Sequence, residues 1–256
     1  MNVINKDSLK ILNNHLNYKK NPFDHIVIDN FLKQKYIDKL VNYSQKLKLS
    51  NCTDKRLPPN EETQYKYAYN DIDNFPDEIK YIFNDLLSKD FCLILENFTN
   101  IKNIITDNNK LKGAGIHKIT KNGFLNLHTD FNNYNDNKYG SLDRRINIII
   151  YLNPDWKEEY MGHLWLCNKD PKEVKKKILP IINRCVIFNT TNKSIHGHPQ
   201  RLKVPDDKMH RNSIALYYYT KNSNTNKCFE NDLFHGTIYY KTNTFKRNQK
   251  LLNIFE

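Results

Sequence analysis

A histidine and an aspartate stand two residues apart in the segment "NLHTDFNNYND", residues 126–136. Residues i and i+2 of an extended strand lie on one face, so Phe124, Asn126 and His128 are predicted to share a face, with Asp130 at its end. An imidazole and a carboxylate placed in this way can bind one metal ion. A chain with nine histidines also produces such a pair by chance, so the pair decides nothing alone.

A facial iron(II) site takes two histidines and one carboxylate and leaves three coordination positions open. The third ligand must therefore come from elsewhere, and the later histidines are His163, His196, His198, His210 and His235. We predict His196, within "CVIFNTTNKSIHGHP" (185–199), because Gly197 and Pro199 favour a strand that stops there. His198 lies on the same face if the strand continues, and it is the alternative ligand.

Two further residues with polar chemistry begin the segment "HRNSIALYYYT", residues 210–220. Arg211 and Ser213 share a strand face that leads into an apolar strand. A buried arginine needs a charged partner, and a substrate carboxylate would serve as one. An exposed arginine at a strand edge is the simpler alternative.

The run "RRINIIIYLN", residues 144–153, places Asn147, Ile149 and Tyr151 on one strand face. A buried tyrosine hydroxyl seeks a hydrogen-bond partner, although most such tyrosines are plain core residues. His117, in "GIHKI", is by default a hydrogen-bonded core histidine. The order HxD, then His, then Arg-x-Ser, each at the edge of a short strand, argues against chance.

These residues need strands to position them, and the chain beyond Leu111 is typical of strands. Eight short runs rich in β-branched and aromatic residues alternate with polar turns. They are "GIHKI", "FLNLH", "RINIIIYL", "HLWLC", "KILPII", "CVIF", "SIH" and "SIALYYY". No long helix separates them, so we predict an antiparallel sandwich or barrel.

The N-terminal half is predicted to be mainly helical. A strand at His25–Ile28 precedes an amphipathic helix over 33–49, then a polar loop over 50–75, then one helix from Pro76 through 98. The helices are expected to pack on the outside of one sheet. The fold class is therefore mainly β with flanking helices (α+β).

The domain limits follow from these patterns and from the length of 256 residues. We assign an N-terminal extension to 1–21, one domain to 22–220 with its barrel at about 111–220, and a tail to 221–256. The tail holds a possible strand at 236–241.

The formal charge of +12 would suit nucleic acid or an acidic substrate, but the Asn-, Lys- and Ile-rich composition is typical of AT-rich coding. Five cysteines without a CxxC pair favour a reducing compartment. The first 20 residues do not resemble a signal peptide, and the longest apolar run, 146–152, is too short for a membrane span. We therefore expect a soluble cytoplasmic protein without membrane contact.

The stretches "HTD", "RRINIIIYLNPDW", "GHLWL", "NRCVIFNTTNKSIHGHP" and "RNSIALYYYT" resemble the iron(II)/2-oxoglutarate-dependent dioxygenases of the prolyl-4-hydroxylase type. "PFDHIVIDNFL" also resembles the opening of that family's domain, so the resemblance covers roughly 22–220. It implies a double-stranded β-helix, a jelly-roll or cupin-like barrel with N-terminal helices on one sheet.

The resemblance also implies roles for single residues. His128, Asp130 and His196 match the iron ligands. Arg211 matches the residue that pairs with the distal carboxylate of 2-oxoglutarate, and the other implied cofactor contacts are Tyr151, Ser213, His117, Asn147, Ile149 and Leu164. The long polar loop between Asp130 and Arg144 departs from the family and is expected to shape substrate access.

The implied reaction is hydroxylation of an unactivated C–H bond with Fe(II), 2-oxoglutarate and O2, releasing succinate and CO2, with ascorbate as a candidate reductant. Asp130 favours hydroxylation over halogenation, because halogenating relatives lack this carboxylate.

A prolyl residue of a protein or peptide is the expected substrate, and a free amino acid or sugar derivative is the alternative. A nucleic-acid demethylase is disfavoured because "RNSIALYYY" lacks that group's second arginine. A metal-binding barrel without oxygenase activity stays as a rival, and the sequence does not reveal the oligomeric state.

Overall fold

The computed structural model describes residues 2–56, 62–106, 113–221 and 235–240. Four α-helices lie in the N-terminal half: α1 (Lys6–Leu12), α2 (Gln34–Lys46), α3 (Asp77–Leu86) and α4 (Lys89–Thr99). The strands that precede β6 are β1 (His25–Ile28), β2 (Asp54–Arg56), β3 (Thr63–Tyr69), β4 (Gly115–Thr129) and β5 (Asn133–Asp136). The remaining strands are β6 (Gly140–Tyr151), β7 (Leu164–Cys167), β8 (Val174–Ile178), β9 (Cys185–Asn189), β10 (His196–His198), β11 (Arg211–Lys221) and β12 (Ile238–Tyr239).

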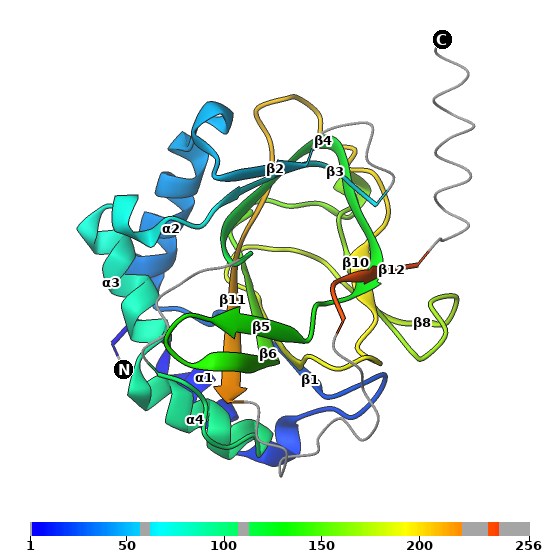
Figure 1. Ribbon diagram of the computed structural model, residues 1–256. Coiled ribbons are helices and arrows are strands. Elements are labelled where there is room, and N and C mark those ends of the chain that lie inside the picture. Colours follow the sequence, from blue (N-terminus) through cyan, green and yellow to red (C-terminus); the bar gives the residue numbers. More distant parts are fainter. Residues whose placement is uncertain (1, 57–61, 107–112, 222–234, 241–256) are drawn as a thin grey trace.

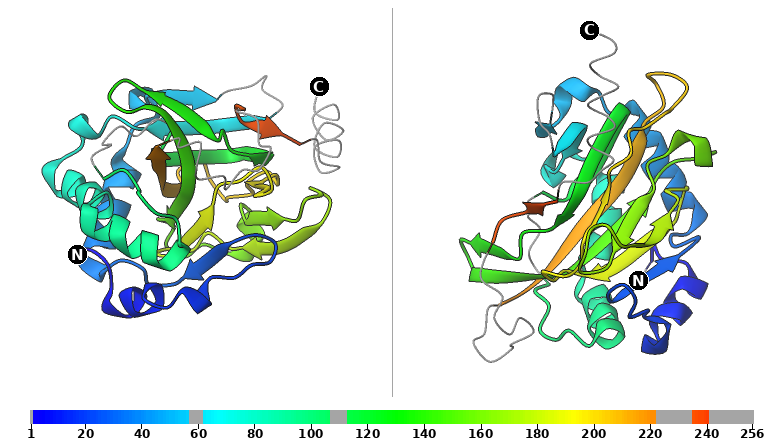
Figure 2. Two further views of the ribbon diagram at one scale, coloured as in Figure 1. Left: turned by 60° about the horizontal axis from the view of Figure 1, so that its bottom comes forward. Right: turned by 90° about the vertical axis from the view of Figure 1, so that its right-hand side faces the viewer.

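The strands form one continuous antiparallel sheet that folds over on itself into a flattened barrel (Figures 1 and 2). Its main path runs β1-β9-β6-β11-β4-β10-β7-β8. The long strand β4 links the two halves, because its first part pairs with β11 and its second part with β10. β3 lies along the other edge of β4. The predicted double-stranded β-helix architecture is confirmed by this topology.

Alternation along β6 separates the two faces of the larger sheet. Ile146, Ile148 and Ile150 are fully buried and belong to the cluster that also contains the apolar residues of the helices. Tyr151 instead packs inside the barrel with Val186 and Phe188, and Ile149 packs against that group. The prediction that Asn147, Ile149 and Tyr151 share a face is therefore confirmed. The helices lie outside the other face (Figure 1).

The predicted single helix over 76–98 is wrong, because two helices occupy it. α3 ends at Leu86, and Ser88 begins α4 with its hydroxyl accepting a hydrogen bond from the Phe91 amide at 3.3 Å. A serine favours this capping geometry over the helix interior. The helix predicted over 33–49 is confirmed as α2, which buries Tyr36, Ile37, Leu40, Val41 and Ser44.

Two segments predicted as loops contain strands. Residues 50–75 hold the hairpin of β2 and β3, and residues 131–143 hold β5, which pairs with the start of β6. β3 has the sequence "TQYKYAY", in which residues 64–67 are all half-buried, so it lacks the apolar–polar alternation that predicts a strand. The run 177–182 is strand only as far as Ile178.

The N-terminal residues pack into the same core as the helices, since Val3, Ile4 and Leu12 are buried there. Asn183 holds the segment that follows β1, because its side chain accepts a hydrogen bond from the Leu32 amide at 2.8 Å and donates one to the Leu32 carbonyl at 2.9 Å. The tail strand predicted at 236–241 is present as the two-residue β12, and residues 222–234 and 241–256 lie outside the described residues.

In the described part of the chain, no helix is long and apolar enough to cross a membrane. Cys52, Cys92, Cys167 and Cys185 are free thiols, and Cys228 lies outside the described residues.

Candidate metal centre and co-substrate pocket

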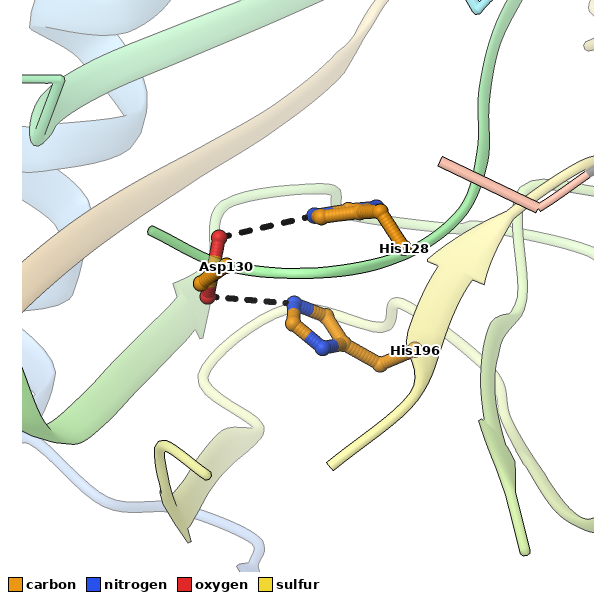
Figure 3. Close-up of side chains that lie close together, drawn as sticks. All are labelled: His128, Asp130 and His196. Carbon is orange, nitrogen blue, oxygen red and sulfur yellow. Dashed lines mark ion pairs between the residues drawn. The ribbon is translucent and has the colours of Figure 1, made fainter. Parts of the chain in front are cut away.

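The three predicted metal ligands meet inside the barrel. His128 lies near the end of β4, Asp130 follows that strand, and His196 begins β10 (Figure 3). The Nε2 atom of His128 is 3.5 Å from Asp130 Oδ1, and the Nε2 atom of His196 is 3.5 Å from Asp130 Oδ2. One donor atom from each residue lies within 4.8 Å of the others, so the set can surround one ion.

Both histidines are held in the orientation that metal binding needs. The Nδ1 atom of His128 lies 2.8 Å from the Asn126 carbonyl, and that of His196 lies 2.8 Å from the Ser194 carbonyl. A carbonyl only accepts, so each Nδ1 carries the proton and each Nε2 presents its lone pair. Burial also lowers the pKa of His196 to about 4, which keeps its ring neutral.

Asp130 is ion-paired with a residue that the sequence analysis did not assign. Arg144 Nη2 lies 2.7 Å from Asp130 Oδ2, and Asn147 Nδ2 donates to the same oxygen at 3.0 Å. Burial opposes ionisation, but Arg144, His196 and His128 together hold the pKa of this carboxyl well below its usual range. In the sequence, the only sign of this role was a charged residue, Arg144, shortly before the apolar run "INIII". The sequence also gave no indication that Asn147 contacts Asp130.

A pocket opens beside the metal ligands and contains most of the predicted co-substrate contacts. Its lining includes His117, Asn147, Ile149, Leu164, Arg211 and Ser213, together with the three metal ligands. Tyr151 lies behind this lining. In the sheet register, Ser213 pairs with Tyr151 on β6 and with His117 on β4, so these three stand in one row.

Arg211 is buried and has no carboxylate within 4.0 Å in the described part of the chain. Its Nε donates to the Gly162 carbonyl at 2.8 Å, and its Nη2 donates to the Tyr151 hydroxyl at 3.3 Å. Gly162 has φ +77°, and a Cβ there would come within 3.0 Å of the arginine side chain. The glycine therefore makes room for a guanidinium that still lacks an anionic partner.

His198, the alternative ligand, is not among the clustered side chains, which are those of His128, Asp130 and His196. The register slips by one residue: His196 pairs with His128, but His198 pairs with Leu125. Leu125 consequently faces the pocket, whereas a regular alternation had placed it on the opposite face from His128. Neither ring nitrogen of His198 has a hydrogen-bond partner among the described residues, and burial, then Arg211, lowers the pKa of His198 well below its usual range.

His117 also lines the pocket, and its ring donates a hydrogen bond to the backbone. Its Nε2 lies 3.1 Å from the Gly113 carbonyl, which identifies that nitrogen as the donor. Burial, with Lys66 and Arg211 nearby, lowers the pKa of His117 well below its usual range. The ring is therefore neutral, with Nδ1 as its acceptor.

The C-terminal strand covers the outer side of the cluster. Tyr239 of β12 is paired with His128 in the register, and the two ring centres are 5.4 Å apart. His235 precedes this strand, and its amide donates to Asn132 at 3.0 Å. His128 therefore lies on β4 with β10 paired on one edge and β12 on the other.

The donor chemistry fits a facial metal site, because two neutral imidazoles and one carboxylate converge from one side. The sequence model of the 2OG-Fe(II) oxygenase superfamily matches residues 114–219, which contain all of these groups. Residues 114–219 belong to the 2OG-Fe(II) oxygenase superfamily. Oxygenases of this superfamily use Fe(II), 2-oxoglutarate and O2, and the cluster of His128, Asp130 and His196 lies within the matched residues.

Known proteins similar to this chain include several prolyl hydroxylases. An 80-residue stretch is 34% identical to mouse (Mus musculus) prolyl 3-hydroxylase OGFOD1, covering 30% of this chain and 14% of that protein. The chain thus spans only a small part of its curated relative's length.

Two solved structures share the fold. A Pseudomonas putida prolyl-4-hydroxylase has a TM-score of 0.56 at 11% identity, covering 84% of this chain and 100% of that one. A Trichoplax adhaerens prolyl hydroxylase, in complex with a hypoxia inducible factor peptide fragment, has a TM-score of 0.54 at 17% identity, covering 84% and 91%. The chain has the double-stranded β-helix fold that these prolyl-hydroxylase structures share.

Proposed function

We propose that this protein is an Fe(II)- and 2-oxoglutarate-dependent dioxygenase that hydroxylates an unactivated C–H bond, with a prolyl residue of a protein or peptide as its substrate. Bound Fe(II) supplies the oxidising chemistry: one atom of O2 enters the substrate as a hydroxyl, and the other enters succinate as 2-oxoglutarate loses CO2. The chain's own residues bind, orient and enclose the reactants.

The observation that carries this proposal is the position of Arg211. A buried guanidinium without an anionic partner lies in the same pocket as a His-Asp-His cluster. His128, Asp130 and His196 are proposed to hold the metal. Arg211 binds the distal carboxylate of 2-oxoglutarate in a charge-assisted contact, with Tyr151 and Ser213 beside it.

The remaining lining residues shape the same pocket. His117, Asn147, Ile149 and Leu164 form walls around the extended co-substrate, and His198 faces it as a neutral ring. The pocket lining contains two basic residues, Lys66 and Arg211, and one carboxylate, Asp130, which is already paired with Arg144. The resulting positive balance suits a dianionic co-substrate.

The prolyl assignment is supported by the similarity to OGFOD1 and by the shared fold with prolyl hydroxylases. Fold and co-substrate chemistry do not select a prime substrate by themselves. A small molecule is the second candidate, because the barrel also resembles HygX of Streptomyces hygroscopicus, solved with nickel, 2-oxoglutarate and hygromycin B, at a TM-score of 0.50 and 10% identity over 86% of this chain and 88% of that one.

The test has two stages. Anaerobic protein is first titrated with Fe(II) and then 2-oxoglutarate, and a visible charge-transfer band is expected for wild type and not for Asp130→Ala. Wild-type protein without this band would favour a metal-binding barrel that is not an oxygenase. In the second stage, Fe(II), 2-oxoglutarate, O2 and ascorbate are supplied with proline-rich peptides, metabolite pools or methylated oligonucleotides.

Succinate release with one added oxygen atom on a prolyl residue is the expected result. Amino-acid analysis then distinguishes 3- from 4-hydroxyproline. Turnover of a metabolite alone would establish the small-molecule alternative, and demethylation of an oligonucleotide would overturn both.

A further inference from the structure

The two oxygens of the Asp130 carboxylate have different surroundings. Oδ2 accepts hydrogen bonds from Arg144 at 2.7 Å and from Asn147 at 3.0 Å, and it lies 3.5 Å from His196 Nε2. Oδ1 is 3.5 Å from His128 Nε2, longer than a normal hydrogen bond. Two strong donors therefore serve one oxygen and leave the other available.

Arg144 is fixed firmly enough to act as a template for this carboxylate. Its guanidinium carbon lies 3.4 Å from the ring centre of Tyr217 and 4.5 Å from that of Phe131. The side chain is 1% exposed, and its backbone amide donates to the Asn132 carbonyl at 3.0 Å. A guanidinium buried between two rings and tied at its own backbone cannot follow a carboxylate that moves.

Asn147 contributes the second donor, and its orientation is set by chemistry. A carboxylate accepts only, so the amide nitrogen must face Asp130. The amide oxygen of Asn147 is buried without a hydrogen-bond partner among the described residues. Because the side chain of Asn147 keeps this orientation although its oxygen has no such partner, we infer that the hydrogen bond to Asp130 determines the orientation.

We propose that Arg144 and Asn147 are positioning residues that restrict Asp130 to binding the metal through Oδ1 alone. The inference rests on the proposed function. A carboxylate that used both oxygens would take a second coordination position. With Oδ2 engaged by two donors, Asp130 takes one position, and the three protein ligands leave three for 2-oxoglutarate and O2.

The neighbouring residue supplies a matched control. Arg145 is also buried, at 5% exposure, but its Nη1 lies 3.3 Å from the Thr220 hydroxyl instead of at the metal cluster. Arg144→Met and Arg145→Met each remove one buried guanidinium from the same strand. A general loss of packing would affect both variants, while loss of positioning would affect only the first.

The experiment measures Co(II) binding by calorimetry and the visible absorption of the Co(II) protein, neither of which requires turnover. Arg144→Met is expected to weaken Co(II) binding about 10- to 100-fold, as removal of groups that orient metal ligands typically does. Its absorption spectrum should also change, because a released Asp130 alters the coordination number. Arg145→Met should match wild type in affinity and spectrum, and Arg144→Lys should recover part of the affinity through its single charged donor.

Asn147→Leu provides a second reading that keeps the Arg144 ion pair. It should shift the Co(II) spectrum in the same direction as Arg144→Met, by a smaller amount. If Arg144→Met does not fold, judged by circular dichroism, Asn147→Leu alone decides. Wild-type affinity and spectrum in the folded variants would overturn the inference, whereas wild-type protein that binds no metal would overturn the proposed function instead.

Discussion

His128 and His196 face each other directly across the antiparallel pair of β4 and β10, with ring centres 4.5 Å apart. Two residues further along, the register has slipped, and His198 is paired with Leu125. The slip assigns different environments to two histidines that the sequence places side by side. His196 joins the metal cluster, and His198 joins the wall of the pocket.

A first prediction therefore compares the effects of replacing His196 and His198 on metal binding. His196→Ala should abolish Fe(II) binding at micromolar metal, because it removes one of three ligands, while His198→Ala should retain the metal. The measurement is iron content after anaerobic loading and desalting. His198→Ala should instead alter 2-oxoglutarate affinity. Equal iron loss in both variants would contradict the ligand assignment.

A second prediction concerns the anchor for the co-substrate. Arg211→Met removes the cation that faces the pocket, and a hydrogen bond to a charged group contributes about 1.5–3 kcal/mol. The Kd for 2-oxoglutarate should rise by roughly 10- to 150-fold, measured by calorimetry on the Co(II)-loaded protein. Metal affinity without co-substrate should stay within about threefold of wild type, a difference of roughly 0.65 kcal/mol. An unchanged Kd for 2-oxoglutarate would remove Arg211 from the site.

A third prediction concerns pH and the buried amine of Lys118. Burial lowers the pKa of Lys118 to about 8, and its Nζ donates to the Leu47 carbonyl at 2.7 Å. Between about pH 8 and pH 10.4, the unfolded state binds more protons than the folded state, so this residue makes stability rise with pH. Below pH 8 both states are protonated, and the burial penalty is constant.

Between pH 8 and pH 10, the free energy of unfolding of wild type should therefore rise relative to that of Lys118→Met by on the order of 2 kcal/mol. Urea unfolding of both proteins at pH 7, 8, 9 and 10 measures this difference. The comparison cancels tyrosine ionisation, which the two proteins share. A difference that stays constant across this range would contradict the lowered pKa.

A fourth prediction concerns the two hydrogen bonds between the side chain of Asn183 and the backbone of Leu32. Asn183→Ala removes both hydrogen bonds to Leu32 and places alanine at φ 59°, so it should destabilise the fold by about 2–4 kcal/mol. Asn183→Gly should lose the same two bonds but regain about 1 kcal/mol, because glycine adopts this conformation freely. Denaturant unfolding measures both. Equal losses would assign the whole effect to the hydrogen bonds.

The sequence was informative where one face of a strand is apolar and the other carries function. β6 and β11 follow this pattern, which made Tyr151, Ser213 and Arg211 predictable as neighbours of the metal ligands. β3 lacks this signal, because residues 64–67 are all half-buried and no apolar face alternates with a polar one, so its sequence resembles a loop. The turn between α3 and α4 was hidden because apolar spacing continues across Ser88.

Non-local features could not be predicted from the sequence. The register slip between β4 and β10 depends on the pairing of segments about 70 residues apart, and no local pattern announces it. The contact of Arg144 with Asp130 likewise arises from the β5–β6 hairpin, which returns β6 beside the end of β4. A charged residue heading an apolar strand gives no indication of its partner.

The pairings of β4 also determine when in protein synthesis the site can exist. This strand contacts β3, which precedes it, and β10, β11 and β12, which follow it. A ribosome exposes His128 and Asp130 well before His196 and Arg211, so the nascent chain presents two ligands without the third. Binding of the proposed metal ion by all three ligands therefore requires the completed barrel, where it would stabilise the native state by mass action.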